Sequence, residues 1–524
     1  MKKSLLCLLI FSLLAGVLSG CGTVLPGETT ESIPETTFSE PQLSAPDQSV
    51  NTLFALPYCY NAAGVFNPIL AHSNICFPLF SLLYDGLFAT DADGNAVPRL
   101  AQEMTAKETT VTIRLRTDAL FHDGSPVDSS DVVWSLKMAI ENADSAYAGR
   151  CSNISSVAAP DRHTVVLTLV SPQGSLANCL DIPIIKNGTG LHSNAVGCGR
   201  YRIIEQDESM YLMANEGWYA RPEDSVFPID LIILTYADGL DDLVYSMVSG
   251  NSNLVRLDPF IFNDKKISGN CDVYPVMSRN FLYIAFNTSY YAPTGTTSVR
   301  KAFAEAIDLE KIVSDHYSGV VYTDGLFPES ITGVSPEPAP KANITAATAL
   351  LREAGYRYLA GKWIDSEGDP LTLTIVSGMD SAKQAVAAAV AHDLTALGAE
   401  CEIKVTDNLS ATVANGNFDI AICQTTLSPD YDFRYLLAYE GAENFNKFVV
   451  PNLEEPLADF FRDGHLQNSD TANKINAAVK DSMPIIPIGY KEDSICISRE
   501  FAFGNIRVAA DDPFFNIFDW VRYR

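Results

Sequence analysis

The chain has little positive charge and lacks the cysteine spacing of common metal and redox sites. It carries 36 Lys and Arg against 64 Asp and Glu among 524 residues, so its formal net charge is -28. Nucleic acid and anionic lipid surfaces repel such a chain, and we exclude nucleic acid as a partner. The spacing Cys-x-x-Cys does not occur, so neither a zinc ribbon nor a thioredoxin-like site is supported.

Complete catalytic motifs are lacking too. The Gly-x-Ser-x-Gly motif of serine hydrolases does not occur. Ser298 and Lys301 match the Ser-x-x-Lys motif of penicillin-recognising enzymes, but Lys-Thr-Gly is missing and the Ser-x-Asn match at 249–251 precedes Ser298 instead of following it. We therefore interpret Ser298 as a helix N-cap. We predict no catalytic residue and no enzyme activity, and keep a surface-anchored hydrolase or transpeptidase as the last alternative.

The seven histidines are scattered, and no two of them have the His-x-x-x-His spacing of helical metal sites. We predict no metal ligand and no cofactor, although scattered residues can still converge in space. His122 lies in FHDGSPVDSSDVVWSLKMA (121–139), where Asp128 and Asp131 have the spacing of a capping box at the start of a helix. The sequence assigns His122 no role beyond a turn.

The N-terminus has the pattern of an export signal with a lipid attachment site. Lys2 and Lys3 precede an apolar run from Leu5 to Leu18 that is too short to span a bilayer comfortably. Leu18-Ser-Gly-Cys21 resembles the lipobox of bacterial lipoproteins, in which the cysteine carries the lipid; an ordinary secretory signal is the alternative. We expect a signal peptide at 1–20 and, at 21–49, the lipidated Cys21 with a flexible Thr/Ser/Glu/Pro-rich tether.

Eleven cysteines are present, and nine remain after Cys7 of the signal and Cys21 are set aside. An odd number cannot pair completely within one chain. Cys401 and Cys423 stand in apolar settings, where a small buried side chain is the expected role. The sequence does not decide the state of the nine.

From about residue 50 the pattern mixes alternating strands with amphipathic helices and indicates an α/β protein of several subdomains. TVTIRLR (110–116) and TVVLTLV (164–170) predict two half-buried strands of one small sheet. Residues 371–376, about 381–397 and 401–405 predict a strand, an Ala-rich helix and a second strand, with Gly398 as the C-terminal cap of the helix. A crossover of this length implies parallel strands.

Several segments then follow one another in a distinctive order. They are YDGLFATDADGNAVPRLAQEM (84–104), RLRTDALFHDGSPVDSSDVVWSL (114–136), VGCGRYRI (196–203), NEGWYARP (215–222), FLYIAFNTS (281–289), SVRKAFAEAIDLEKIV (298–313), AATALLREAGY (346–356) and MPIIPIGY (483–490). In content and order they resemble the family 5 extracellular solute-binding proteins of ABC importers, which include oligopeptide- and dipeptide-binding proteins. The resemblance covers nearly the whole chain after the tether.

This resemblance implies an α/β, two-lobed, periplasmic-binding-protein-like clamp of the large, cluster C type, with an extra small α/β subdomain at about 100–195. Lobe I would comprise 50–285 plus 487–524, and lobe II 286–486. Ligand would bind in the cleft, and the lobes would close by hinge bending.

The function implied is that of an extracytoplasmic monomer, lipid-anchored to the bacterial plasma membrane at the cell surface or in the periplasm. It would capture a small solute, above all peptides, and deliver it to the permease subunits of an ABC transporter. The alternatives are a binder of nickel, of a metal complex or of another small solute with the same fold, and a peptide sensor.

The resemblance also implies ligand-binding residues in FDIAICQTTLSPDYDFRYLL (418–437). In peptide-binding relatives an aspartate at the position of Asp430, followed by Tyr431, pairs with the peptide ammonium, and the strand backbone at Thr426 and Ser428 would add the peptide as a further strand. The alternative is that Asp430 only starts a turn after Pro429. The segment also departs from the family, because Asp432-Phe433 replaces the usual Asp-Pro.

Two further contacts are expected. Phe66, in VFNPIL (65–70), would touch ligand beside the first strand or else pack in the core. Arg434 would receive a peptide carboxylate through a bidentate fork, or else lie on a solvated helix face.

Overall fold

The computed structural model describes residues 53–59, 66–70, 74–258, 271–317, 319–444, 447–464, 469–501 and 503–522. The expected signal peptide, Cys21 and the tether lie outside these residues. Within the described part of the chain, no helix combines the length and apolar character needed to cross a membrane.

One small sheet carries the first strand and part of the middle of the chain. Its order is β1-β10-β9-β8, and β1 pairs in parallel with β10 while the other pairs are antiparallel. The bounds are Phe54–Tyr58 for β1, Tyr201–Gln206 for β8, Ser209–Ala214 for β9 and Leu231–Tyr236 for β10. Helix α1 (Phe77–Leu83) buries most of its side chains in the same apolar cluster.

A second four-stranded sheet lies within the stretch for which a small subdomain was expected. It has the order β4-β5-β7-β6, with β4 at Ala101–Lys107, β5 at Thr110–Leu115, β6 at Ile154–Asp161 and β7 at Thr164–Leu169. The two predicted strands of this sheet are confirmed as the neighbours β5 and β7. Helix α2 (Ser129–Glu141) packs against β6 and β7, and its predicted capping box of Asp128 and Asp131 is confirmed.

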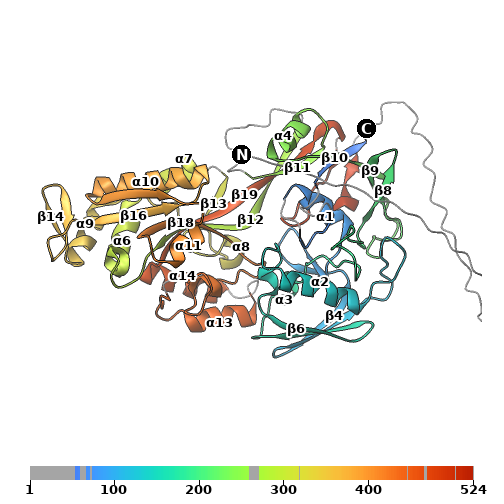
Figure 1. Ribbon diagram of the computed structural model, residues 1–524, viewed down its shortest axis with the longest axis horizontal. Helices are drawn as coiled ribbons and strands as arrows, with labels where there is room; N and C mark the ends of the chain where they lie inside the picture. Colours follow the sequence, from blue (N-terminus) through green and yellow to red (C-terminus); the bar gives the residue numbers. More distant parts are fainter. Residues whose placement is uncertain are drawn as a thin grey trace, which may run out of the picture. The chain divides into compact units, whose positions relative to one another are not determined.

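The largest sheet has seven strands in the order β11-β19-β12-β18-β16-β17, with β13 paired to β19. Two long strands, β12 (Cys271–Phe286) and β19 (Ile485–Ser498), pair with each other over most of their length (Figure 1). The shorter strands are β11 (Leu254–Leu257), β13 (Val320–Tyr322), β16 (Thr372–Ser377), β17 (Glu400–Val405) and β18 (Ile420–Thr426). The parallel β16-α10-β17 crossover, with α10 at Ser381–Leu397 and Gly398 as its left-handed cap, is confirmed.

The long β12 strand supplies side chains to more than one apolar core. Val276 belongs to the cluster around β1, α1 and the small subdomain. Farther along, Leu282 and Ile284 face a cluster with α6 (Thr297–Ala306) and α10. Phe281 and Tyr283 face the opposite side with α13 (Glu454–Asp463) and α14 (Ser469–Ser482), as the alternation of a strand requires. The side chains of β12 thus pass from one apolar cluster to the others between Val276 and Phe281. The lobe boundaries at 285/286 and 486/487 stay a prediction.

Ser298 is not the N-cap that the sequence suggested. Helix α6 begins at Thr297, and Thr296 occupies the cap position without a side-chain capping bond. A 3-10 turn over Pro293–Gly295 leads almost directly into the helix, so the chain turns helical before Ser298 is reached. The prediction was wrong by two residues.

Short elements complete the fold. The hairpins pair β2 (Phe88–Thr90) with β3 (Ala96–Pro98), β14 (Arg357–Leu359) with β15 (Lys362–Ile364) and β20 (Phe503–Gly504) with β21 (Val521–Arg522). The remaining helices are α3 (Leu176–Cys179), α4 (Leu240–Val248), α7 (Leu309–His316), α8 (Glu329–Thr332), α9 (Ile344–Glu353), α11 (Leu409–Ala414) and α12 (Arg434–Leu437).

Candidate functional site

A cavity of about 430 Å³ lies where segments from several parts of the fold meet. One side is formed by Phe77 and Phe80 of α1 and by the loop 143–150 after α2. The other side is formed by residues 278–280 of β12 and by residues 426–428 at the end of β18. The cavity therefore joins the subdomain-bearing part of the chain to the large sheet.

Arginines and aspartates supply the charge of the cavity wall. The lining contains Arg150, Arg256 and Arg279 together with Asp493 and Asp511. A third carboxylate, that of Asp181, pairs with this group from outside the cavity lining, since its Oδ1 lies 3.1 Å from Arg150 Nη1. Three guanidinium groups therefore face three carboxylates, and these pairs hold guanidinium donors in place for the carboxylate of a ligand.

These charged groups are already arranged as ion pairs. Arg279 donates to both oxygens of Asp511, at 2.5 Å and 2.9 Å, and Arg150 Nη2 lies 3.7 Å from Asp511 Oδ1. Arg256 Nη2 lies 2.6 Å from Asp493 Oδ2. Burial disfavours the charged form of Asp511, but Arg279 and Arg150 outweigh it and hold the pKa of its carboxyl well below the usual range.

The predicted strand edge borders this cavity. Thr426 and Ser428 both line it, and Thr426 pairs with Asn280 of β12 in the sheet. Leu427 donates its backbone N–H to the oxygen of Arg279 at 2.9 Å. Because alternate residues of a strand direct their N–H and C=O groups to opposite edges, the groups of Thr426 face away from β12. On that edge the described pairing with β16 ends at Ala421.

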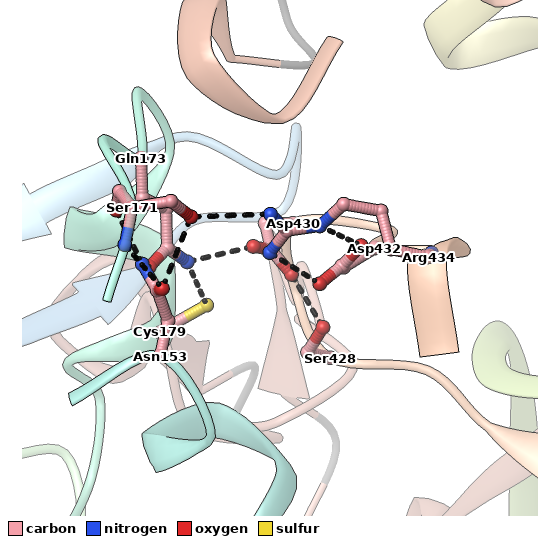
Figure 2. A network of polar contacts seen from close by, with 8 residues as sticks. All are labelled: Asn153, Ser171, Gln173, Cys179, Ser428, Asp430, Asp432 and Arg434. Atoms are coloured by element: carbon pink, nitrogen blue, oxygen red, sulfur yellow. Dashed lines mark hydrogen bonds and ion pairs between the residues drawn. The ribbon is translucent and has the colours of Figure 1, made fainter. Parts of the chain in front are cut away.

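Asp430 is hydrogen-bonded to both Ser428 and Gln173, in a contact between two distant segments (Figure 2). The residue is 4% exposed. Gln173 Nε2 donates to Asp430 Oδ2 at 2.7 Å, and Ser428 Oγ donates to Asp430 Oδ1. Burial, and then the charge of Asp432, raise the pKa of Asp430. This carboxylate is held by neutral donors instead of a cation.

The same contact contains Arg434, the predicted carboxylate receiver. Arg434 Nε lies 2.9 Å from Asp432 Oδ1, and its Nη1 donates to Ser171 Oγ at 3.2 Å (Figure 2). Its guanidinium also stacks on the ring of Phe461, 3.1 Å from the centroid. In this arrangement the donors of Arg434 hold neighbouring side chains of the protein.

The loop 171–174 is the other half of this contact. Gln173 Oε1 accepts from Asn153 Nδ2 at 3.0 Å, and Asn153 Nδ2 also donates to the Ser171 oxygen at 2.8 Å. The backbone N–H of Gly174 donates to the oxygen of Phe461 at 3.0 Å. Gly174 has no room for a larger residue, because a Cβ there would lie 2.6 Å from the backbone of Asp463. The loop therefore fits closely against the end of α13.

The other two candidates, Phe66 and Tyr431, are not part of the cavity lining. Phe66 is 1% exposed, and its ring lies 5.8 Å from that of Tyr58. Tyr431 has a φ of 54°, in the left-handed region, and its ring lies 5.9 Å from that of Tyr490. Burial raises the pKa of Tyr431. Thr426 and Ser428 are thus the candidates on the cavity wall, and the ligand roles of all six stay predictions.

The sequence did not predict the arginines of the cavity wall, Arg150, Arg256 and Arg279, or the contact of Gln173 with Asp430. Arg150, Arg279 and Asp511 come from three segments far apart in the chain, so no local spacing connects them. Gln173 lies 257 residues from Asp430, in a loop without a recognisable motif. Within the described residues, no group of three or more His, Cys, Asp or Glu is placed to hold a metal ion.

Comparison with known proteins gives a consistent result. The profile of the bacterial extracellular solute-binding proteins, family 5 (middle part), matches residues 95–447. The nickel-binding periplasmic protein of Escherichia coli strain K12 is 26% identical over 496 residues, which cover 86% of this chain and 92% of that protein. These relatives are substrate-binding proteins and not enzymes, in agreement with the expectation from the missing motifs.

Solved structures share the two-lobed α/β fold. The unliganded open form of the periplasmic murein tripeptide-binding protein MppA aligns with a TM-score of 0.71 at 19% identity, covering 90% of this chain and 98% of that one. NikA from Brucella suis, solved in complex with Fe(III)-EDTA, aligns with a TM-score of 0.70 at 18% identity, covering 90% and 99%. The predicted fold class is confirmed.

Proposed function

Because the chain belongs to the bacterial extracellular solute-binding proteins of family 5, we propose that it captures peptides in the cavity beside β18 and delivers them to the permease of an ABC transporter. We further propose that the lipid on Cys21 tethers it to the outer face of the plasma membrane and that it acts as a monomer. The observation that carries the proposal is the conjunction of a strand edge with an arginine-lined wall.

The strand edge supports a peptide ligand. The backbone groups of Thr426 that point away from β12 are suited to a further extended strand, and such pairing recognises any peptide regardless of its side chains. Ser428 follows on the same cavity wall. Main-chain pairing would supply affinity, while the cavity volume would limit the length of the peptide.

The two charged regions support recognition of both peptide ends. Arg150 and Arg279 share Asp511, and a ligand carboxylate brought to this cluster would find guanidinium donors already oriented. Among the described residues Asp430 has no cationic partner, and a peptide ammonium would supply one at the carboxylate lone pairs that Gln173 and Ser428 leave free. In this proposal the ammonium role of Asp430 is kept, and the carboxylate is assigned to Arg150 and Arg279 in place of Arg434.

A metal complex is the second candidate, favoured by the likeness to the nickel-binding protein of Escherichia coli. The arginine wall would bind the carboxylates of a chelating molecule by the same chemistry that receives a peptide carboxylate. A peptide sensor with the same cavity would differ only in its partner protein.

Native mass spectrometry of the protein purified from its own host tests the ligand. We expect a mixture of added masses that extraction resolves into peptides. A single metal chelate or sugar, with no peptide, would overturn the peptide proposal and leave the family assignment intact. The tether is tested separately by the mass of the N-terminal fragment, which should carry diacylglycerol on Cys21, and by release of a Cys21→Ala variant from membranes.

A further inference from the structure

Cys59 directly follows β1 and Cys76 directly precedes α1, and the side chains of these two cysteines are in contact. Cys59 Sγ lies 3.0 Å from Cys76 Sγ. Cys76 Sγ also lies 2.9 Å from the backbone N of Cys59 and 3.1 Å from its oxygen. Since the sulfurs of a disulfide are about 2.05 Å apart, these two are within about 1 Å of bonding distance.

We propose that Cys59 and Cys76 form a disulfide in the exported protein and that this bond fixes the segment of the cavity wall between them. The bond would close a loop between residues 17 positions apart in the sequence. Proteins that work outside the cytoplasm meet oxidising conditions in which such bonds persist.

The two thiols differ in their exposure to solvent. Cys76 is 1% exposed, whereas Cys59 is half-buried. The hydrogen bond with Cys59, and then burial, raise the pKa of the Cys76 thiol. Cys59 is therefore the sulfur that meets an oxidant first, and Cys76 is the resolving sulfur.

The oxidant in this proposal is the disulfide of an external thiol oxidoreductase. The Cys59 thiolate attacks one sulfur of that disulfide, which breaks and releases its other sulfur as a thiolate. Cys76 then attacks Cys59 Sγ and displaces the remaining sulfur of the oxidoreductase. The two cysteines lose two electrons and two protons, and the oxidoreductase gains both electrons and both protons as a dithiol.

The bond would restrain one wall of the ligand cavity. Pro68, between the two cysteines, lines the cavity, and Phe77 lines it directly after Cys76. The intervening segment already has anchors, because Ala195 donates its N–H to the Phe66 oxygen at 2.8 Å and Ser145 Oγ donates to the Ile69 oxygen at 2.7 Å. A disulfide between Cys59 and Cys76 would hold the end of β1 beside the start of α1. It would also reduce the conformational entropy of the unfolded chain.

Two other cysteines lie near enough to compete with Cys76 for a bond with Cys59. Cys271 and Cys496 belong to one small apolar cluster, and Cys59 packs against it. Cys271 and Cys496 are in side-chain contact with each other, and Cys59 Sγ lies 3.0 Å from Cys76 Sγ, so the geometry favours the Cys59–Cys76 pair. The test must identify which sulfurs are joined.

The test traps thiols with N-ethylmaleimide in intact cells, before the full lipid-anchored chain is purified in detergent and digested without reduction. We expect a peptide pair joined through Cys59 and Cys76, with maleimide on neither residue until a reductant is added. Cys59 and Cys76 recovered in separate, unjoined peptides, or Cys59 joined to Cys271 or Cys496, would overturn the proposal.

A second measurement tests the effect on the wall. Dithiothreitol should lower the thermal midpoint of the wild-type protein and leave that of a Cys59→Ser/Cys76→Ser variant unchanged. Cys179→Ser, a buried cysteine elsewhere, is the matched control and should keep the wild-type response. Equal responses in wild type and double variant would show that the bond does not restrain the fold. If the double variant fails to fold, peptide mapping of the wild type still decides the proposal.

Discussion

Two carboxylates beside the cavity have opposite surroundings. Asp511 meets the guanidinium groups of Arg279 and Arg150, and its pKa is held below the usual range. Asp430 meets the amide of Gln173 and the hydroxyl of Ser428, and burial raises its pKa. One negative charge is balanced by arginines, whereas the other is stabilised, among the described residues, by neutral hydrogen-bond donors.

The difference indicates separate tasks. A carboxylate that is paired with arginines stabilises the fold and orients guanidinium donors toward the cavity. A buried carboxylate without a cation gains most when a ligand supplies one, because the burial cost has already been incurred in the folded protein. The comparison therefore predicts that changes at Arg279 lower stability as well as binding, whereas changes at Asp430 act mainly on binding.

The largest expected effect is that of Arg279→Ala on stability. It removes the bidentate partner of Asp511 and leaves the more distant Arg150 and Arg256. We expect a loss of about 3 kcal/mol in the free energy of unfolding, at the low end for a buried pair because both side chains keep some exposure. Urea unfolding at neutral pH measures it. Arg462→Ala, which removes exposed ion pairs with Asp459 and Asp463, is the control and should cost about 1 kcal/mol or less.

Asp430→Asn should separate binding from stability. The amide oxygen can still accept from Gln173, and the amide NH2 can donate to Ser428 Oγ, so we expect little change in the free energy of unfolding at neutral pH. Affinity for a peptide with a free amine should fall by about 2–3 kcal/mol. Calorimetry with that peptide and with its N-acetylated form measures the effect. If both peptides lose affinity equally, Asp430 does not contact the ammonium.

Local patterns in the sequence predicted the regular elements well. The β16-α10-β17 unit follows from apolar alternation, an Ala-rich run and Gly398, all of which act within a few residues. The prediction that Ser298 is the N-cap of α6 was wrong because Thr296, Thr297 and Ser298 all have side chains that can cap a helix. A 3-10 turn precedes the helix, and α6 begins at Thr297.

The site was less predictable than the fold. The resemblance placed Thr426 and Ser428 on the strand that borders the cavity, and both lie on its wall. Arg279 and Asp511 are 232 residues apart, and their pairing depends on how β12 and the C-terminal loop pack, which no short window of sequence encodes. The contact between Gln173 and Asp430 could not be predicted for the same reason, because the two residues are 257 positions apart in the sequence.

A third prediction uses pH to compare the two carboxylates. Because the pKa of Asp430 is raised in the folded state, folding is favoured by its protonation, and this contribution is lost as pH rises through the raised pKa. The difference in unfolding free energy between wild type and Asp430→Asn should therefore shift in favour of wild type as the pH is lowered from neutral through this raised pKa. Urea unfolding of both proteins over a series of pH values measures it.

Asp511 gives the opposite sign in the same experiment. Its lowered pKa stabilises the folded state above the usual carboxyl range and loses that effect only in stronger acid. As the pH falls below the usual carboxyl range, the stability advantage of wild type over an Asp511→Asn variant should therefore shrink. A pH-independent difference for Asp430→Asn would contradict the assignment of Asp430 as the carboxylate without a charged partner.

The smallest expected effect is that of Gln173→Ala, which removes the neutral donor to Asp430 and the acceptor for Asn153. The lost contact joins two distant segments, so we expect weaker closure around ligand, with affinity reduced by about 0.5–1 kcal/mol and the unfolding midpoint almost unchanged. Calorimetry with one peptide measures it, and Gln206→Ala, an exposed glutamine at the end of β8, is the control. Tighter binding in Gln173→Ala would mean that Gln173 competes with the ammonium for Asp430, and that the contact in Figure 2 opens when ligand binds.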